Sequence, residues 1–255
     1  MTTSVRQARR PSTAPQRRTA RGRTVPGWAV AVAGVLGAVV ITAVVLLTAG
    51  HRDAAAGTPA PLAPPPTAVV AEINGQDIPV REFTLYLAQE RAATFAHFRQ
   101  AYGVSDGPDF WTTPHGGTTP AAYARKLALA DVTRAAVVLG LAQRHGLIAD
   151  PGYDAFLTSW TAENARRRDA VAAHQVVYGP VQYTEANYLN YVLHDLDARL
   201  ETKLTRSGDI TVPDRLKGQD RQAYVHERYR SMTAKLARSA RTRVARAVYD
   251  AVPVN

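Results

Sequence analysis

The apolar residues of this chain follow two different patterns. Residues 28–50 form a single run of 23 residues without a charged side chain. From residue 67 onward, apolar residues recur instead at helical spacing, between segments that are rich in Gly and Pro. The pattern therefore predicts one transmembrane helix followed by a separate, mostly helical domain over residues 67–255.

The uncharged run has the length and the flanking charges of a membrane anchor. As a helix it would reach roughly 34 Å, enough to cross a hydrocarbon core of about 30 Å. Seven Arg residues precede the run, and only Arg52 follows it closely. The positive-inside rule then places the N-terminus in the cytoplasm and residues 51–255 outside the cell membrane. A cleaved signal peptide, cut near Ala54–Ala56, is the alternative, although its apolar part is normally only about 7–15 residues long.

The net charge of +10 is concentrated at the N-terminus. Residues 1–27 hold the seven Arg, no acid and few apolar residues, so we expect a disordered basic cytoplasmic tail there. The chain after residue 50 is only slightly basic, so we expect no binding of nucleic acid. Residues 51–66 are rich in Pro and Ala and are expected to form a semi-rigid linker of up to about 50 Å.

The domain is expected to begin with a short β-hairpin and to continue as helices. Residues 68–73 favour a strand, and Asn74-Gly75 is a strong tight-turn signal. Helical patterns then follow, with a short helix at Pro213, over residues 81–102, 120–145, 151–175, 185–206 and 220–251. The second helix is apolar on most sides, which is typical of a buried central helix.

The start of this domain resembles the N-terminal chaperone module of SurA-type proteins, which is also present in PrsA and PpiD foldases. The family pattern is a strand ending in Val-Asn-Gly, followed by a helix that begins near Thr-x-x-Glu-Phe. Here Ile73-Asn74-Gly75 and Glu82-Phe83 match, with Val80 where Thr is usual. Residues 141–157 and 210–229 are similar to later segments of the family. The resemblance implies a SurA-N-like helical domain that binds unfolded polypeptides.

The chain departs from the family in one major respect. Many members carry a parvulin-type prolyl isomerase domain, an α/β unit of about 90–100 residues, and no such stretch is found here. The match therefore implies the chaperone module without the enzyme. PrsA is anchored by a lipid on cysteine, which this chain lacks, so the single N-terminal span is closer to PpiD.

Motifs for catalysis or metal binding are weak in this sequence. Residues 103–107 fit G-x-S-x-G, but a helix rather than a strand precedes Ser105. His226-Glu227 begins an HExxH-like string whose last position is Arg230, so a zinc site would lack its second His. Asp197 and Glu201 share a helix face with interleaved basic residues, which favours a solvated charged face. We therefore expect no catalytic residue, no metal and no cofactor.

Five aromatic residues are candidate contacts for unfolded clients: Phe95, Phe98, Tyr102, Phe110 and Trp111. The first three lie on the helix over 81–102, where aromatic residues more often belong to the core. Phe110 and Trp111 lie in a loop rich in Gly and Pro, so they are the better candidates for an exposed apolar contact.

The net positive charge of the domain comes from the region of the last predicted helix. Residues 228–255 hold seven basic residues and one acid, whereas residues 67–227 carry a net charge of −3. Met232, Leu236, Ala240, Val244 and Val248 form part of one apolar stripe. One interpretation is that this helix docks on its own acidic domain. The other is that Arg238, Arg241 and Arg246 contact anionic lipid or wall polymer of the cell envelope.

These observations lead to the hypothesis of a membrane-anchored, extracytoplasmic, chaperone-like protein that binds newly exported polypeptides without catalysis. Two alternatives remain open. One is an enzyme related to peptidyl-prolyl isomerases. The other is a dedicated structural partner of an envelope or export complex.

Overall fold

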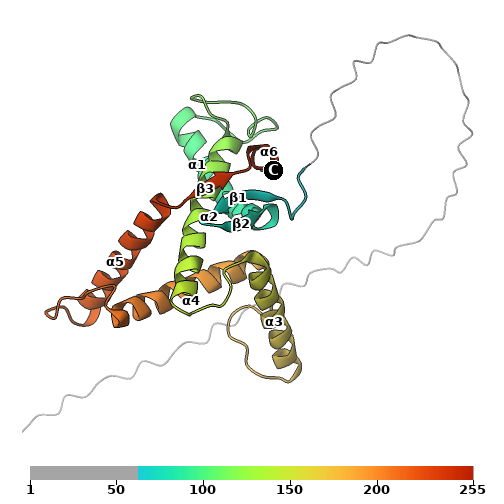
Figure 1. Ribbon diagram of the computed structural model, residues 1–255. Helices are drawn as coiled ribbons and strands as arrows, with labels where there is room; N and C mark the ends of the chain where they lie inside the picture. Colours follow the sequence, from blue (N-terminus) through green and yellow to red (C-terminus); the bar gives the residue numbers. More distant parts are fainter. Residues whose placement is uncertain (1–62, 255) are drawn as a thin grey trace, which may run out of the picture. The chain divides into compact units, whose positions relative to one another are not determined.

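The fold is described from a computed structural model, which covers residues 63–254 (Figure 1). These residues form a small three-stranded sheet and six helices. The strands are β1 (Val69–Ile73), β2 (Gln76–Pro79) and β3 (Thr242–Val244); the helices are α1 (Val80–Tyr102), α2 (Pro120–Arg144), α3 (Tyr153–Ala172), α4 (Glu185–Ser207), α5 (Gly218–Arg238) and α6 (Arg246–Ala251). The expected mostly α-helical fold with a short N-terminal hairpin is confirmed.

The expected anchor lies outside the part of the chain that the structure describes. This is true of the predicted tail over 1–27, the span over 28–50 and the linker up to residue 62. The described residues, 63–254, belong to one compact unit. Among the described helices, none combines the length and apolar character needed to cross a bilayer. The anchor therefore stays a prediction from the sequence.

The hairpin turn joins the two ends of the domain. Asn74 and Gly75 both have positive φ, 53° and 88°, as the predicted tight turn requires. The Asn74 N–H donates to the carbonyl of Arg241 at 2.8 Å, and the Arg241 N–H donates to Asn74 Oδ1 at 2.9 Å. β3 then pairs antiparallel with β1, which gives the order β2-β1-β3 with β1 in the centre.

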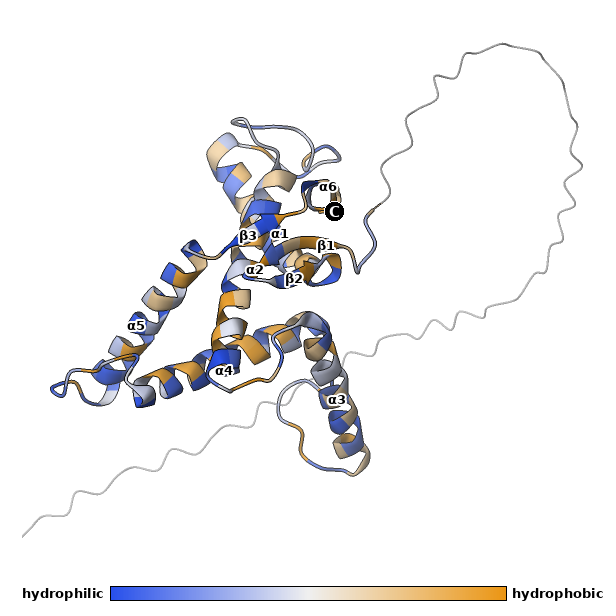
Figure 2. Ribbon diagram, in the orientation of Figure 1, coloured by the Kyte–Doolittle hydropathy of each residue, from blue (hydrophilic) through white to orange (hydrophobic). Residues whose placement is uncertain are grey.

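The first two helices begin and end close to where the sequence predicts. Gly103, with φ of 67°, closes α1 in the left-handed conformation that glycine adopts easily. Thr119 Oγ1 accepts a hydrogen bond from the Ala122 N–H at 3.1 Å, and Pro120 follows as the first residue of α2. As expected, α2 is buried on most sides and is the central helix; Figure 2 shows hydrophobic residues spread along it.

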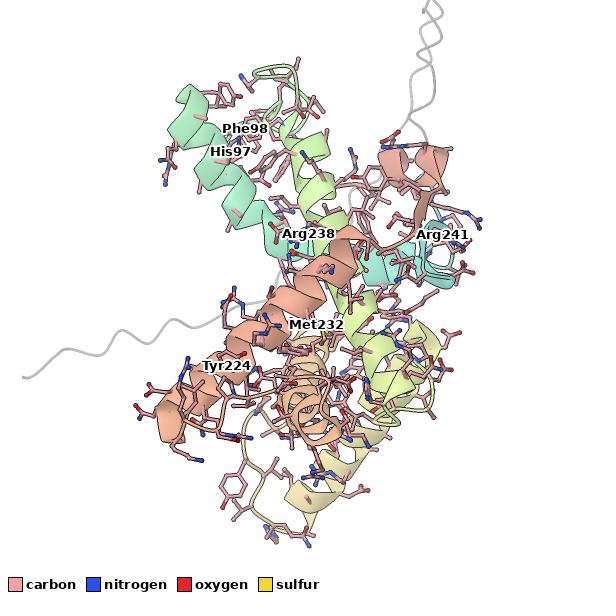
Figure 3. All side chains as sticks on the ribbon, turned by 60° about the vertical axis from the view of Figure 1, so that its left-hand side comes forward. His97, Phe98, Tyr224, Met232, Arg238 and Arg241 are labelled. Atoms are coloured by element: carbon pink, nitrogen blue, oxygen red, sulfur yellow. The ribbon has the colours of Figure 1, made fainter. Side chains whose placement is uncertain are left out.

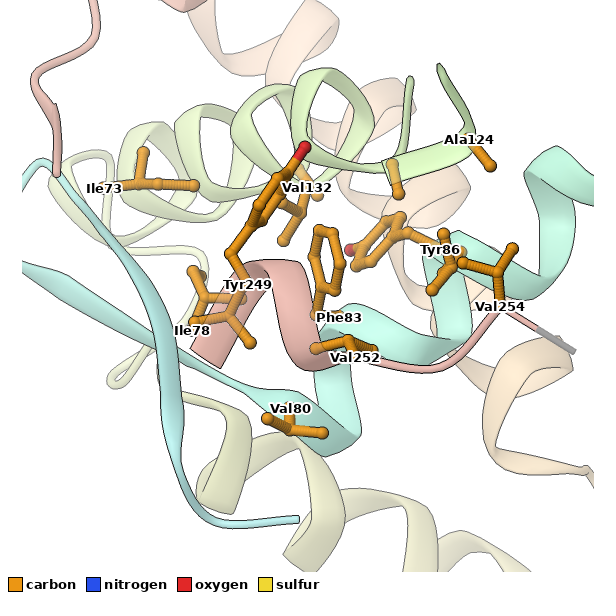
Figure 4. Packing of buried hydrophobic residues seen from close by; sticks show 14 of the residues in the cluster. Ile73, Ile78, Val80, Phe83, Tyr86, Ala124, Val132, Tyr249, Val252 and Val254 are labelled. Carbon is orange, nitrogen blue, oxygen red and sulfur yellow. The ribbon is translucent and has the colours of Figure 1, made fainter. Parts of the chain in front are cut away.

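Two apolar clusters meet along α2. The first lies between the sheet, α1, the first half of α2 and α6, and it is centred on Ile78, Phe83, Val132 and Tyr249 (Figure 4). The second joins the last turns of α2 to α4 and α5 through residues that include Leu200. Because α2 contributes to both clusters, it holds the two halves of the domain together.

The expected single helix over 220–251 is wrong, and so is the short helix at Pro213. Residues 211–217 form a turn, and α5 ends at Arg238. Residues 242–244 form β3 instead, because Thr242 and Val244 are β-branched and β1 offers unpaired backbone groups at its edge. The predicted stripe is therefore divided: Met232 packs in the second cluster, whereas Val244 and Val248 pack against the first.

One carboxyl group is buried in the first cluster. Glu82, in the first turn of α1, is 2% exposed, and its Oε2 atom has no hydrogen-bond partner. Burial raises the pKa of Glu82 from its ordinary value near 4.5 to about 8. Nearby, burial followed by a hydrogen bond with Asp131 raises the pKa of Glu90 to about 7.

Replacing Glu82 should show how much the buried carboxyl group lowers the stability of the fold at neutral and higher pH. Between pH 4.5 and 8 the folded protein keeps a proton on Glu82 that the unfolded chain releases, so stability falls as pH rises. We expect Glu82→Gln to increase the free energy of unfolding at pH 8 by about 2–5 kcal/mol and to have little effect near pH 4. Urea denaturation of both proteins from pH 4 to 9 measures this difference.

Glu227→Gln is a matched control, because Glu227 is exposed on α5. Its stability curve should follow that of the wild type. If the curves of Glu82→Gln and wild type stay parallel across this pH range, the assignment of a neutral, buried Glu82 is wrong.

Candidate functional site

The five predicted client-contact residues form one aromatic cluster. Figure 3 labels one of them, Phe98, on α1. The ring of Phe95 stacks on Phe110 at 4.4 Å and meets the edge of Trp111 at 5.0 Å. Phe98 lies 6.1 Å from Phe110 and 5.5 Å from Tyr102. The loop over 103–119 therefore folds back onto α1 rather than extending into solvent.

The expected exposure of Phe110 is wrong. Phe98 is fully buried and Phe110 is 3% exposed, because Phe95, Phe98 and Trp111 pack around the Phe110 ring. Phe95 and Trp111 are half-buried, and only Tyr102, at 45%, presents a large exposed surface. The cluster thus stabilises its own loop, and a contact with clients at Tyr102 stays a prediction.

Besides Val69 and Tyr102, five large apolar side chains are exposed within residues 63–254, and these five lie in another part of the domain. They surround the loop of residues 173–184 between α3 and α4, which we call the α3–α4 loop. Val176, Tyr178 and Val181 within this loop are 77%, 85% and 58% exposed. Val171 near the end of α3 and Tyr191 on α4 are also exposed, and the Tyr191 ring lies 5.5 Å from the Tyr183 ring of the loop. A clustered apolar surface of this kind indicates a binding site more strongly than scattered residues do.

A buried arginine fixes the backbone of this loop. The Arg167 side chain, 8% exposed, lies on α3, and its Nη1 atom donates to the carbonyls of Tyr178 at 2.9 Å and Pro180 at 2.7 Å. Its Nε atom donates to Glu163 Oε1 at 2.7 Å. The guanidinium group also lies 4.3 Å from the ring centre of Tyr183. One side chain thereby holds three residues of the loop.

Two further side chains of α3 bind the end of the loop at Tyr183. Asn164 Oδ1 accepts from the Tyr183 N–H at 2.8 Å, and its Nδ2 donates to the Tyr183 carbonyl at 2.9 Å. Trp160 Nε1 donates to the same carbonyl at 2.9 Å. The backbone of the loop is therefore well satisfied while its apolar side chains face solvent. Such a surface binds without first losing the entropy of becoming ordered.

The sequence contains a signal for this loop. A search for catalytic motifs and for helical spacing does not detect it. Residues 176–181 read Val-Val-Tyr-Gly-Pro-Val, an apolar run inside a segment that connects two helices. Connecting segments are usually polar, so an apolar run in one suggests a contact surface. Nothing local to the loop indicates that Arg167 would hold it.

A groove of about 990 Å³ lies beside the hairpin. The turn at Asn74 and Gly75 forms one wall, and α2 forms another through Val137 and Gly140. The remaining walls come from residues 150–154 and from the end of α5, where Leu236 lines the groove. Both polar and apolar residues line it, which suits the backbone and side chains of an extended polypeptide.

The predicted envelope contacts are all exposed but differ in their surroundings. Arg238 ends α5 and lines a second groove, between α5 and α2. Arg241 is held beside the hairpin turn through its backbone. The guanidinium group of Arg246 lies 5.6 Å from the ring centre of Tyr249. Figure 3 shows Arg238 and Arg241 near the same end of α5.

The acids on α4 join helices instead of converging on one point. Glu201 lies 2.7 Å from Nδ1 of His226 on α5, and Asp197 accepts a hydrogen bond from the Tyr229 hydroxyl. Burial raises the pKa of Asp197, although the Tyr229 hydrogen bond opposes this effect. Within residues 63–254, no three His, Asp or Glu side chains are grouped to hold a metal ion. Ser105 lies in the exposed loop after α1.

Removing the Arg167 guanidinium group should loosen the α3–α4 loop. We expect Arg167→Met to leave the carbonyls of Tyr178 and Pro180 without their donor and to cost about 2–3 kcal/mol of stability. Hydrogen–deuterium exchange over residues 173–184 should become at least about tenfold faster, corresponding to a loss of about 1.4 kcal/mol in local protection. Mass spectrometry of peptic fragments measures this exchange.

Arg166→Met is the matched control for this variant. Arg166 also pairs with Glu163, at 2.7 Å, but its side chain is 62% exposed. Exposed ion pairs contribute under about 1 kcal/mol, so exchange in the loop should change little. Equal protection in wild type and Arg167→Met would show that Arg167 does not hold the loop.

The geometry alone supports the assignment of these surfaces. Comparisons with protein-family models, with curated proteins and with solved structures found no match to this chain. The resemblance to SurA-type modules therefore stays a prediction from the sequence.

Proposed function

We propose that the chain is a membrane-anchored, chaperone-like protein that binds unfolded, newly exported polypeptides outside the cytoplasm without catalysis. The observation that carries this proposal is the α3–α4 loop, which presents Val176, Tyr178 and Val181 to solvent on a fixed backbone. Unfolded chains expose apolar side chains that folded proteins bury. A preformed apolar surface therefore favours unfolded chains over folded ones.

The groove beside the hairpin supplies a second contact in this proposal. Its polar groups can hydrogen-bond to the backbone of an extended chain, whatever the sequence of that chain. Its apolar groups, such as Val137 and Leu236, can receive side chains. Weak binding at both surfaces suffices, because a membrane tether raises the local concentration of the domain near exported chains.

The finer fold assignment is part of the same proposal. The strand, the Asn74-Gly75 turn and the helix that starts before Glu82-Phe83 follow the order of the SurA-type N-terminal module. This order supports a SurA-N-like domain. The 23 uncharged residues over 28–50 and the Arg residues before them support a single-pass anchor with the domain outside.

Two other functions compete with this one. An isomerase related to parvulins would need an α/β unit, whereas the described residues form one sheet of three short strands. A dedicated partner of an envelope complex could use the same α3–α4 loop against one folded protein. An aggregation assay separates this alternative, because such a protein would not protect unrelated unfolded chains.

The test is suppression of aggregation by residues 58–255, the compact unit that carries both core clusters. A chemically denatured model protein is diluted with near-equal molar amounts of this unit, and light scattering is followed. We expect the wild type to suppress scattering and Tyr178→Ser/Val181→Ser to lose most of this effect. Both side chains are mostly exposed, so the variant should stay folded.

Tyr102→Ser is the control in this experiment, because it removes an exposed aromatic ring from another surface. It should suppress aggregation nearly as well as the wild type. Loss of activity in Tyr102→Ser alone would move the client contact to the aromatic cluster. No suppression by the wild type at several-fold excess would reject general chaperone function and favour the dedicated-partner alternative.

Filling the groove should weaken client binding separately. Gly140 lies on α2 and lines the groove, and a Cβ atom there would meet nothing closer than Arg144 Nη1 at 3.7 Å. Gly140→Tyr should therefore fold and place its ring in the groove, and we expect reduced suppression of aggregation. Gly140→Ala should keep the activity and raise the melting temperature by about 2–4 °C, because Ala is a better helix former than Gly.

The two Gly140 variants form a matched pair, since both stiffen α2 and only one fills the groove. If they suppress aggregation equally well, the groove does not contact the client and the α3–α4 loop acts alone.

A further inference from the structure

A second groove, of about 510 Å³, lies between α2 and the end of α5. Three cationic side chains reach it: Lys126 and Arg134 from α2, and Arg238 from α5. No acidic residue lines it, although the described residues contain many acids elsewhere. Apart from Thr133 and Thr242, the rest of its lining, which we call the floor, is apolar: Leu129 and four alanines, among them Ala234 and Ala237. The groove therefore combines positive charge with an apolar base.

The positive charge around this groove is largely uncompensated. Neither Lys126 nor Arg238 makes an ion pair within residues 63–254. Arg134 pairs with Asp131 at 2.9 Å, but its side chain stays 60% exposed. The surrounding segment, residues 228–255, carries a net charge of +6. An anion in this groove would thus meet two cations without an ion pair, Lys126 and Arg238.

The combination of features specifies the chemistry of the ligand. Arginine and lysine side chains that line one groove suit a phosphate group, which accepts several charge-assisted hydrogen bonds. A free inorganic anion would make no use of the apolar floor. A phosphate esterified to glycerol and acyl chains would place its polar end among the cations and its apolar part over the alanines.

We propose that this groove binds the phosphate headgroup of an anionic membrane phospholipid. Only 12 residues separate the uncharged run that ends at Gly50 from the first described residue, Ala63. A linker of this length spans at most about 40 Å. The expected anchor would hold the groove within reach of a lipid surface. The proposal does not depend on client binding, which uses other surfaces.

The experiment measures vesicle binding by residues 58–255 without the anchor. Vesicles of phosphatidylcholine with about 30% phosphatidylglycerol are compared with pure phosphatidylcholine vesicles by co-sedimentation at low and high salt. We expect binding to the anionic vesicles only, weakened by salt. Each basic residue near an anionic surface contributes about fivefold to affinity, so Lys126→Gln/Arg238→Gln should weaken binding by about 25-fold.

Arg168→Gln/Arg206→Gln is the matched control, with the same change in net charge at exposed residues on α3 and α4. This variant should lose no more than about twofold in affinity, because its charges lie away from the groove. Thermal unfolding verifies that both double variants fold like the wild type.

Three outcomes would overturn the proposal. Equal losses in the two double variants would show a diffuse charge effect with no site. Equal binding to neutral and anionic vesicles would show that phosphate charge is not recognised. Groove-dependent binding to a soluble poly(glycerol phosphate), with no binding to vesicles, would assign the groove to a wall polymer and reject the lipid.

Discussion

The pairing of β1 with β3 is the constraint on which the rest of the domain depends. It joins residues 71–73 to residues 242–244, and the reciprocal hydrogen bonds between Asn74 and Arg241 close the junction. This pairing ends α5 at Arg238 and returns the chain across the sheet, so that α6 covers the first core cluster. It also fixes the end of α5 against α2. Ala240, in the connection before β3, lines both grooves for this reason.

Local signals predicted the beginning of the domain well. The Asn74-Gly75 turn, the glycine that ends α1 and the Thr119-Pro120 start of α2 each depend on a few neighbouring residues. The prediction of one long last helix was wrong because residues 242–244 follow a helical pattern in the sequence. The strand with which they pair, β1, lies about 170 residues earlier in the chain. α5 follows the helical pattern only as far as Arg238. At Thr242 and Val244 the chain pairs with β1 instead, because the hydrogen bonds of the strand stabilise it more than a continued helix would.

The surfaces were harder to predict than the elements. Phe110 lies in a Gly- and Pro-rich loop, which usually means exposure, yet α1 supplies Phe95 and Phe98 to cover it. Conversely, Val176 and Tyr178 would normally be buried, and Arg167 would normally face water. Here the arginine is buried because the loop carbonyls and Glu163 satisfy it, and the apolar side chains are left outside. The sequence shows which residue types are present, but it does not show that the arginine is buried while the valine and tyrosine side chains are exposed.

The α3–α4 loop and the cationic groove can be occupied together because they differ in position and in charge. Figure 1 shows α3 and its loop at the end of the domain away from β3, whereas the cationic groove lies where α5 approaches β3. Binding a lipid headgroup at the groove would therefore leave the α3–α4 loop clear of the bilayer. The loop presents Val and Tyr side chains, and its one buried cation, Arg167, is neutralised by Glu163. Anionic lipid would then not compete with an apolar polypeptide for the same surface, so anchoring and client binding could operate together.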